Sequence, residues 1–196
     1  MIRGEKYHLF NHANGKENLF VEQKNYPFFL QRLAQHILPV CKLYSYCLMP
    51  NHFHLVLQVH FKEELQKLWQ KNEQFPALSP KQLELKISKA FSNFFSSYTQ
   101  SEVYNRMGSM FIPSMKTELI EDNSSFCKRV HCTHTNPVHH GFTKRMEDWP
   151  HSSYKIFFSK SPTKLEREYV LESFGGLDAF IKYHHQPIDL KSKFLE

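Results

Sequence analysis

Two alternating segments at residues 40–59 constrain the fold of this chain more than any other feature. Residues 40–49 (VCKLYSYCLM) are β-branched and aromatic and alternate along the chain, as is typical of a strand. Pro50 and Asn51 interrupt this pattern, and His52–Val59 (HFHLVLQV) then alternates strictly. Two strands joined by such a short turn predict an antiparallel hairpin in the middle of a sheet.

The segments around the hairpin predict a first strand and two helices. Residues 6–12 (KYHLFNH) are typical of a strand, and residues 25–38 have helical periodicity with Pro27 in the first turn. Residues 61–70 predict a helix or lid. After a loop, Ser79 is a helix cap and Pro80 begins a long helix that extends to about residue 104. Its apolar positions form one stripe: Leu83, Ile87, Phe91, Phe94 and Tyr98.

The second half of the chain is less regular. Residues 109–121 predict a short extended segment with a loop, and residues 124–135 predict a helix that Asn136 and Pro137 stop. Residues 143–160 are typical of a loop, and residues 165–185 predict one or two last helices.

This order of elements predicts an α+β fold: a ferredoxin-like split βαβ with a central antiparallel sheet and helices packed on one face. We expect residues 1–160 to form this domain, and residues 161–196 to form a C-terminal helical extension packed on it.

Composition narrows the functional classes. With 41% hydrophobic residues the chain is expected to form a core, and its formal net charge of +6 suits a polyanionic partner. It contains no apolar stretch long enough to predict a membrane span, and its first residues (MIRGEK) have no apolar signal core, so we expect no membrane partner and a cytoplasmic location.

His52 and His54 are the first candidate site. Residues i and i+2 of a strand point to the same face, so the two imidazoles are expected side by side on the open face of the sheet, with Phe53 and Leu55 on the other. Two imidazoles in this arrangement can hold a divalent cation.

The residues around this pair resemble the signature strand of the HUH single-tyrosine transposases, in particular the REP-associated tyrosine transposase branch. The resemblance lies in residues 48–57 (LMPNHFHLVL) and extends over about residues 7–185. Its other segments are residues 7–11 (YHLFN), 91–99 (FSNFFSSYT), 104–111 (YNRMGSMF), 134–141 (HTNPVHHG) and 149–154 (WPHSSY).

The resemblance implies a DNA transposase or endonuclease that cleaves and rejoins single strands through a 5′-phosphotyrosine. It makes Tyr98 the nucleophile, with Tyr104 as the alternative. As the last member of its stripe, Tyr98 is expected at the rim of the sheet with an exposed hydroxyl. His52 and His54 are then the ligands of Mg²⁺ or Mn²⁺.

The family also implies a third ligand one turn after the tyrosine, which is Glu102 here. The stretch from Tyr98 to Asn105 is shorter than in the family, so Gln100 and Asn105 remain alternatives.

The implied partner is single-stranded or hairpin DNA, of the REP type, in a bacterial nucleoid. The segment after Phe111 carries fewer basic residues than the family does, so the DNA contacts are expected elsewhere: Lys42, Arg106, Lys128 and Arg129. The family includes both monomers and homodimers, and either state is compatible with the sequence.

Two other functional classes remain as alternatives. A domesticated relative would bind structured nucleic acid without cutting it. A zinc site would use the cluster Cys127, His131, Cys132 and His134, but its spacing matches no common zinc module, and reduced buried thiols are the better interpretation.

Overall fold

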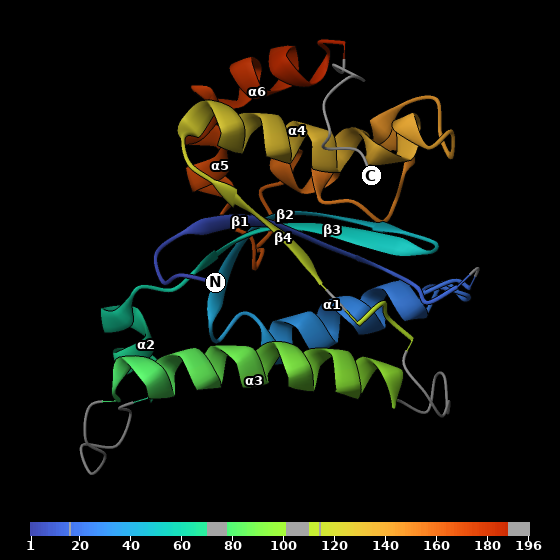
Figure 1. Cartoon of the computed structure of the whole chain (residues 1–196). Coiled ribbons are helices and arrows are strands. Elements are labelled where there is room, and N and C mark those ends of the chain that lie inside the picture. The colour runs from blue at the N-terminus through green and yellow to red at the C-terminus, as the bar shows by residue number, and fades with distance from the viewer. Residues whose placement is uncertain (16, 70–77, 101–109, 114, 188–196) are drawn as a thin grey trace.

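The computed structural model contains one sheet with helices on both sides (Figure 1). It describes residues 1–15, 17–69, 78–100, 110–113 and 115–187. The four strands are β1 (Lys6–His12), β2 (Cys41–Met49), β3 (His52–Val59) and β4 (Lys116–Ile120). Their order in the sheet is β2-β3-β1-β4, and each is antiparallel to its neighbours.

This order is that of a ferredoxin-like split βαβ. The helix α1 (Asn25–His36) connects β1 to β2, and β3 lies between these two strands in the sheet. The predicted fold class, with its central antiparallel sheet, is therefore confirmed. So is the hairpin, because Met49 pairs with His52 and Cys41 pairs with Val59.

The first face of the sheet is covered by α1 and by α3 (Pro80–Thr99), as the lower layer of Figure 1 shows. All five residues of the predicted stripe on α3 are buried there, so the helical periodicity was correct. Ser79 caps α3 through a reciprocal pair: its hydroxyl accepts from the Gln82 backbone N–H, and the Gln82 side chain accepts from the Ser79 N–H. The short helix α2 (Lys62–Trp69) precedes α3.

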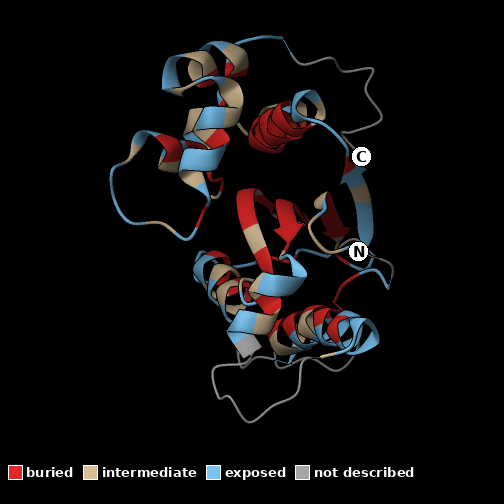
Figure 2. Ribbon diagram, turned by 90° about the vertical axis from the view of Figure 1, so that its left-hand side faces the viewer, coloured by how far each residue is buried: buried red, intermediate tan, exposed pale blue. Residues whose placement is uncertain are grey.

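The second face is also covered, which corrects the expectation of helices on one face only. The helices α4 (Asn123–His139), α5 (Arg167–Phe174) and α6 (Leu177–His184) lie above the sheet in Figure 1. Every residue of β3 is buried, and Figure 2 shows the strands enclosed between two helical layers. The physical reason is a second apolar core, in which Val56 packs with residues of α4, α5 and α6.

The helix α4 continues through Pro137 to His139, so the predicted stop at Asn136-Pro137 is wrong. Proline within a helix removes one backbone hydrogen bond, and this loss matters little near a C-terminus, where the last carbonyls lack helical partners anyway. The Pro137 carbonyl instead accepts from the Phe142 N–H at 2.8 Å. Two 3-10 turns, Met146–Asp148 and Tyr154–Phe158, occupy the region predicted as loop.

The C-terminal helices share the second core with the sheet. Val170 of α5 and Phe180 of α6 are fully buried in it. A domain boundary at residue 160 stays a prediction. Within the described residues, no helix combines the length and apolar character that a membrane crossing requires.

Candidate metal site

His52 and His54 lie on β3 and face α4. Their side chains are 3% and 1% exposed, so the expectation that they lie on an open face is wrong. The ring of His140, just after α4, is 4.9 Å from that of His52, and it covers the strand at this end. The expected side-by-side placement is correct, because the two ring centroids are 5.1 Å apart.

Each imidazole is held through its Nδ1 atom. The Nδ1 of His52 is 2.8 Å from the Asn51 side-chain oxygen, and the Nδ1 of His54 is 2.9 Å from the Nε2 of His8. The Nε2 atoms of both residues are buried and have no hydrogen-bond partner. A buried polar atom without a partner costs free energy unless a ligand satisfies it, so these two atoms point to a bound group.

Burial keeps both imidazoles neutral. It is the largest cause that lowers the pKa of His52 to about 3, and His12 and His140 lower this pKa further. Burial also lowers the pKa of His54 well below its usual value. A neutral imidazole offers a lone pair to a metal, whereas a protonated one does not.

The third donor at this site is an amide. Asn136 of α4 is 1% exposed and lies beside His52, whose pKa it raises, and its buried Oδ1 has no hydrogen-bond partner. Within the described residues, no three His, Cys, Asp or Glu side chains are grouped to hold a metal ion. Two imidazole nitrogens and one amide oxygen nevertheless lie close together as potential donors to a divalent ion, and an amide oxygen is of the type that Mn²⁺ and Mg²⁺ prefer.

Sequence reasoning missed Asn136, because Asn-Pro was interpreted as a helix stop. The available signal was its place within residues 134–141, one of the segments that carry the family resemblance.

Tyr98 lies away from this site. It is fully buried, and its hydroxyl donates to the Leu19 carbonyl at 2.8 Å. The ring of Phe29 contacts both Tyr98 and Phe53, at 5.2 and 5.0 Å, so Tyr98 is on the Phe53 face, opposite the histidines. The expectation of an exposed hydroxyl is therefore wrong for this structure, and the role of Tyr98 as nucleophile stays a prediction.

Several predicted residues fall outside the described part of the chain: Glu102, Tyr104, Asn105 and Arg106. Gln100, an alternative ligand, caps the C-terminus of α3 and is thus not on the histidine face.

The predicted DNA-binding residues that the structure describes do not form a cationic surface around the histidines. Lys42 pairs with Glu64 at 2.7 Å, at the end of the sheet next to Gln58. Along β3 at about 3.3 Å per residue, this is roughly 20 Å from His52. Arg129 is buried and pairs with Glu118 at 2.7 Å, so it is not the surface cation that was expected, and Lys128 is half-buried on α4. Their roles in DNA binding stay predictions.

The cysteine and histidine cluster of α4 belongs to the second core. Cys127 and Cys132 are buried thiols, and the Cys127 thiol donates to the Ser173 carbonyl. The Nδ1 of His134 is 2.9 Å from the Nε2 of His184, a direct hydrogen bond that leaves no room for a metal between these atoms.

Comparisons with known proteins find the same fold and a related sequence. A solved structure of a REP-associated tyrosine transposase bound to a REP hairpin has the same fold, with a TM-score of 0.58. The similarity covers 82% of this chain and 84% of that one, at 15% sequence identity.

A curated protein of Haemophilus influenzae, named "Putative REP-associated tyrosine transposase", is 24% identical over 110 residues. The match covers 55% of this chain and 56% of the relative, so about half the length of that relative is matched. No protein-family model matches the chain. Both comparisons lead to the branch that the sequence motifs resemble, and the resemblance to REP-associated tyrosine transposases is confirmed.

Proposed function

We propose that this chain is a transposase of the REP-associated type, which binds hairpin-forming single-stranded DNA and cleaves it with the help of a divalent ion. The single observation that carries this proposal is the pair of buried imidazoles, His52 and His54, whose Nε2 atoms have no partner. The similarity to a transposase whose structure holds a REP hairpin supports the class of substrate.

In this proposal His52, His54 and Asn136 hold Mg²⁺ or Mn²⁺. The bound ion would polarise the scissile phosphate and stabilise the charge that develops on its oxygens. Other parts of the chain position the ligands and exclude water. Asn51 and His8 fix the two rings through Nδ1, and α4 excludes bulk water from the histidine face.

The proposed nucleophile is the Tyr98 hydroxyl. Its oxygen would form a bond to phosphorus, its proton would pass to a base, and the DNA 3′ oxygen would leave as a free hydroxyl. The protein then carries the 5′ phosphate, and the 3′ hydroxyl can reverse the step, so that rejoining needs no nucleotide hydrolysis. For this reaction Tyr98 must leave the Leu19 carbonyl, which requires the end of α3 to open.

A second candidate function is binding of structured DNA without cleavage. The buried Tyr98 hydroxyl on the face opposite the histidines favours it, because no described tyrosine hydroxyl is shown in contact with the metal-binding atoms.

Covalent trapping decides between the two. The full chain is incubated with a labelled hairpin-containing single strand and Mn²⁺, and the adduct is resolved by denaturing electrophoresis and mass spectrometry. The transposase proposal predicts an adduct on Tyr98 that Tyr98→Phe abolishes and Tyr104→Phe retains. An adduct on Tyr104 would reassign the nucleophile, and hairpin binding without any adduct would leave the second candidate.

The substrate is tested separately by binding. Affinity for a single strand with a stem-loop should exceed that for a blunt duplex of matched length, and it should fall with salt as phosphate contacts release counterions. Equal affinity for the two DNAs would contradict the proposed substrate.

A further inference from the structure

A line of hydrogen bonds runs behind His54, on the side away from its unpartnered Nε2 atom. The Nδ1 of His54 is 2.9 Å from the Nε2 of His8, and the Nδ1 of His8 is 3.2 Å from a carboxylate oxygen of Glu118. The same oxygen is 2.7 Å from the guanidinium of Arg129. Glu118 belongs to β4, His8 to β1 and His54 to β3, so the line crosses three adjacent strands.

The carboxylate fixes the direction of every bond in this line. An ionised carboxylate only accepts hydrogen bonds, so the proton between Glu118 and His8 is on the His8 Nδ1. A neutral His8 then has a lone pair on Nε2, and the proton between the two rings is on the His54 Nδ1. The Nε2 of His54 is left with a lone pair and no hydrogen.

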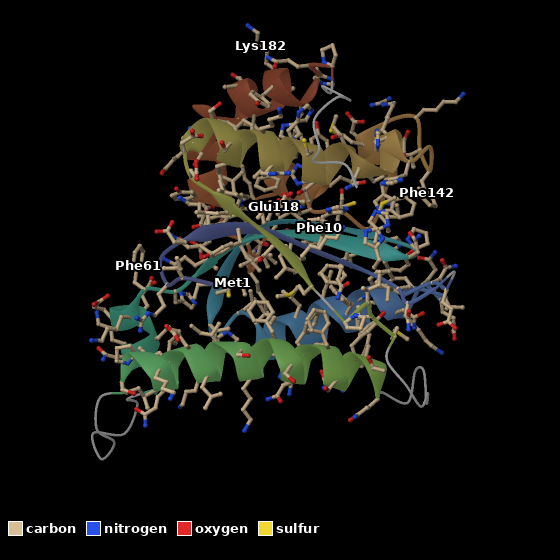
Figure 3. All side chains as sticks on the ribbon, viewed as in Figure 1. Met1, Phe10, Phe61, Glu118, Phe142 and Lys182 are labelled. Carbon is tan, nitrogen blue, oxygen red and sulfur yellow. The ribbon has the colours of Figure 1, made fainter. Side chains whose placement is uncertain are left out.

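The rings are also held in place by stacking. His8 and His54 are nearly parallel, with centroids 5.1 Å apart and an interplanar angle of 7°. Phe10 stacks against both, at 5.0 and 5.5 Å. Figure 3 labels Phe10 and Glu118 in the layer between the sheet and α4. His8 is 3% exposed, so no bulk water competes for its two nitrogens.

We propose that Glu118 and His8 are positioning residues that hold His54 in the tautomer with hydrogen on Nδ1, so that its Nε2 is presented as a metal ligand. In metal sites generally, a carboxylate that accepts from a ligating histidine fixes the orientation of the ring and raises its basicity. Here the imidazole of His8 lies between the carboxylate and the ligand. The role in metal binding rests on the proposed function, whereas the tautomer of His54 does not.

The proposal also gives Arg129 a role. Its buried guanidinium lies against the Glu118 carboxylate and keeps it charged, and this explains why a cation expected on the DNA-binding surface is found in the interior.

The tautomer is measured first, without metal or DNA. Long-range ¹H–¹⁵N spectra of the full chain distinguish a protonated from an unprotonated ring nitrogen, and a His54→Gln spectrum assigns the His54 signals. The expected result is hydrogen on Nδ1 alone. His8→Phe keeps an aromatic ring in the stack but removes the acceptor, so signals of the Nε2–H tautomer should appear. An unchanged His54 tautomer in His8→Phe, or Nε2–H in the parent chain, would overturn the proposal.

Metal affinity is measured next, by titration with Mn²⁺ alone. Loss of such supporting partners typically weakens metal binding about 10- to 100-fold, and His8→Phe and Glu118→Gln are expected in this range. Glu64→Gln is the matched control, because Glu64 also pairs with a histidine and a cation, His60 and Lys42, but at the other end of the sheet. Thermal melting confirms that each variant is folded.

Failure of the proposed metal function and failure of this inference give different results. If the parent chain binds no Mn²⁺ while the His54 tautomer responds to His8→Phe, the proposed metal function is wrong, whereas Glu118 and His8 still position His54. If Mn²⁺ binds equally to the parent, His8→Phe and Glu118→Gln, these two residues have no role in presenting the ligand and this inference is wrong. Should Glu118→Gln not fold, because Arg129 loses its partner, His8→Phe carries both measurements.

Discussion

At the level of single residues, Asn136 contributes the oxygen atom of the candidate site. Its Oδ1 is buried without a hydrogen-bond partner beside His52. Asn136→Ala removes this donor, and we expect the affinity for Mn²⁺ to fall by about tenfold or more, since even supporting partners contribute that much. Asn123→Ala is the control, because this asparagine is exposed at the other end of α4. An unchanged affinity would remove Asn136 from the ligand set.

The buried hydroxyl of Tyr98 gives a second prediction at this scale. Tyr98→Phe leaves the Leu19 carbonyl without its donor in the core, and we expect the free energy of unfolding to fall by about 1–2 kcal/mol. Urea denaturation measures this change. Tyr169→Phe, whose ring is 39% exposed, should have little effect. Equal stability of parent and Tyr98→Phe would mean that the hydroxyl is not held at Leu19 in solution.

At the level of elements, the sequence predicts the strands and helices better than the faces they share. Alternation correctly placed His52 and His54 on one face and Phe53 on the other, and periodicity correctly placed Tyr98 in the buried stripe of α3. The prediction did not combine the strand alternation with the helical stripe. An apolar stripe packs on the apolar face of a sheet, so Tyr98 accompanies Phe53 and not the histidines.

The helix α4 could not be assigned to the histidine face from its sequence. Its residues from Val130 to Pro137 are all buried, including three polar residues and two histidines, and no stripe indicates which side meets the sheet. Such burial depends on tertiary partners, here α6 and the turn around Ser153, whose hydroxyl oxygen is 2.8 Å from the Nε2 of His134. Local periodicity carries no information on these contacts.

A mutation that destabilises α3 should leave metal binding on the opposite face of the sheet unchanged. Ser79→Ala removes both the cap acceptor and the capping box of α3, which typically costs about 1 kcal/mol. Because α3 lies on the face opposite the histidines, Mn²⁺ affinity should not change. Ser92→Ala on the exposed side of the same helix is the control for stability. A loss of metal affinity in Ser79→Ala would show that the two layers are coupled.

At the level of the whole molecule, the chain buries neutral histidines on the α4 side of the sheet: His52 and His54 on β3, and His134 and His184 where α4 meets α6. Burial lowers the pKa of His52 and of His184 to about 3, and it lowers the pKa of His54 and His134 well below the usual value of 6.5. The Nδ1 of His184 donates to the Phe180 carbonyl, so its Nε2 accepts from His134 and cannot take a proton without breaking that bond.

These shifts fix the direction of the pH dependence. Between pH 6.5 and about 3 the unfolded chain binds protons at these histidines and the folded chain does not. Protonation therefore favours the unfolded state, and the free energy of unfolding should be fully present above pH 6.5 and fall as the pH is lowered. Each such histidine contributes up to about 1.4 kcal/mol per pH unit well below its unfolded pKa. Urea denaturation at pH 7.5, 6 and 5, repeated in about 0.5 M salt to screen general charge repulsion, measures the slope. A His184→Gln variant should have a shallower slope than the parent, and a stability that is equal at pH 7.5 and pH 5 would contradict the burial of neutral histidines.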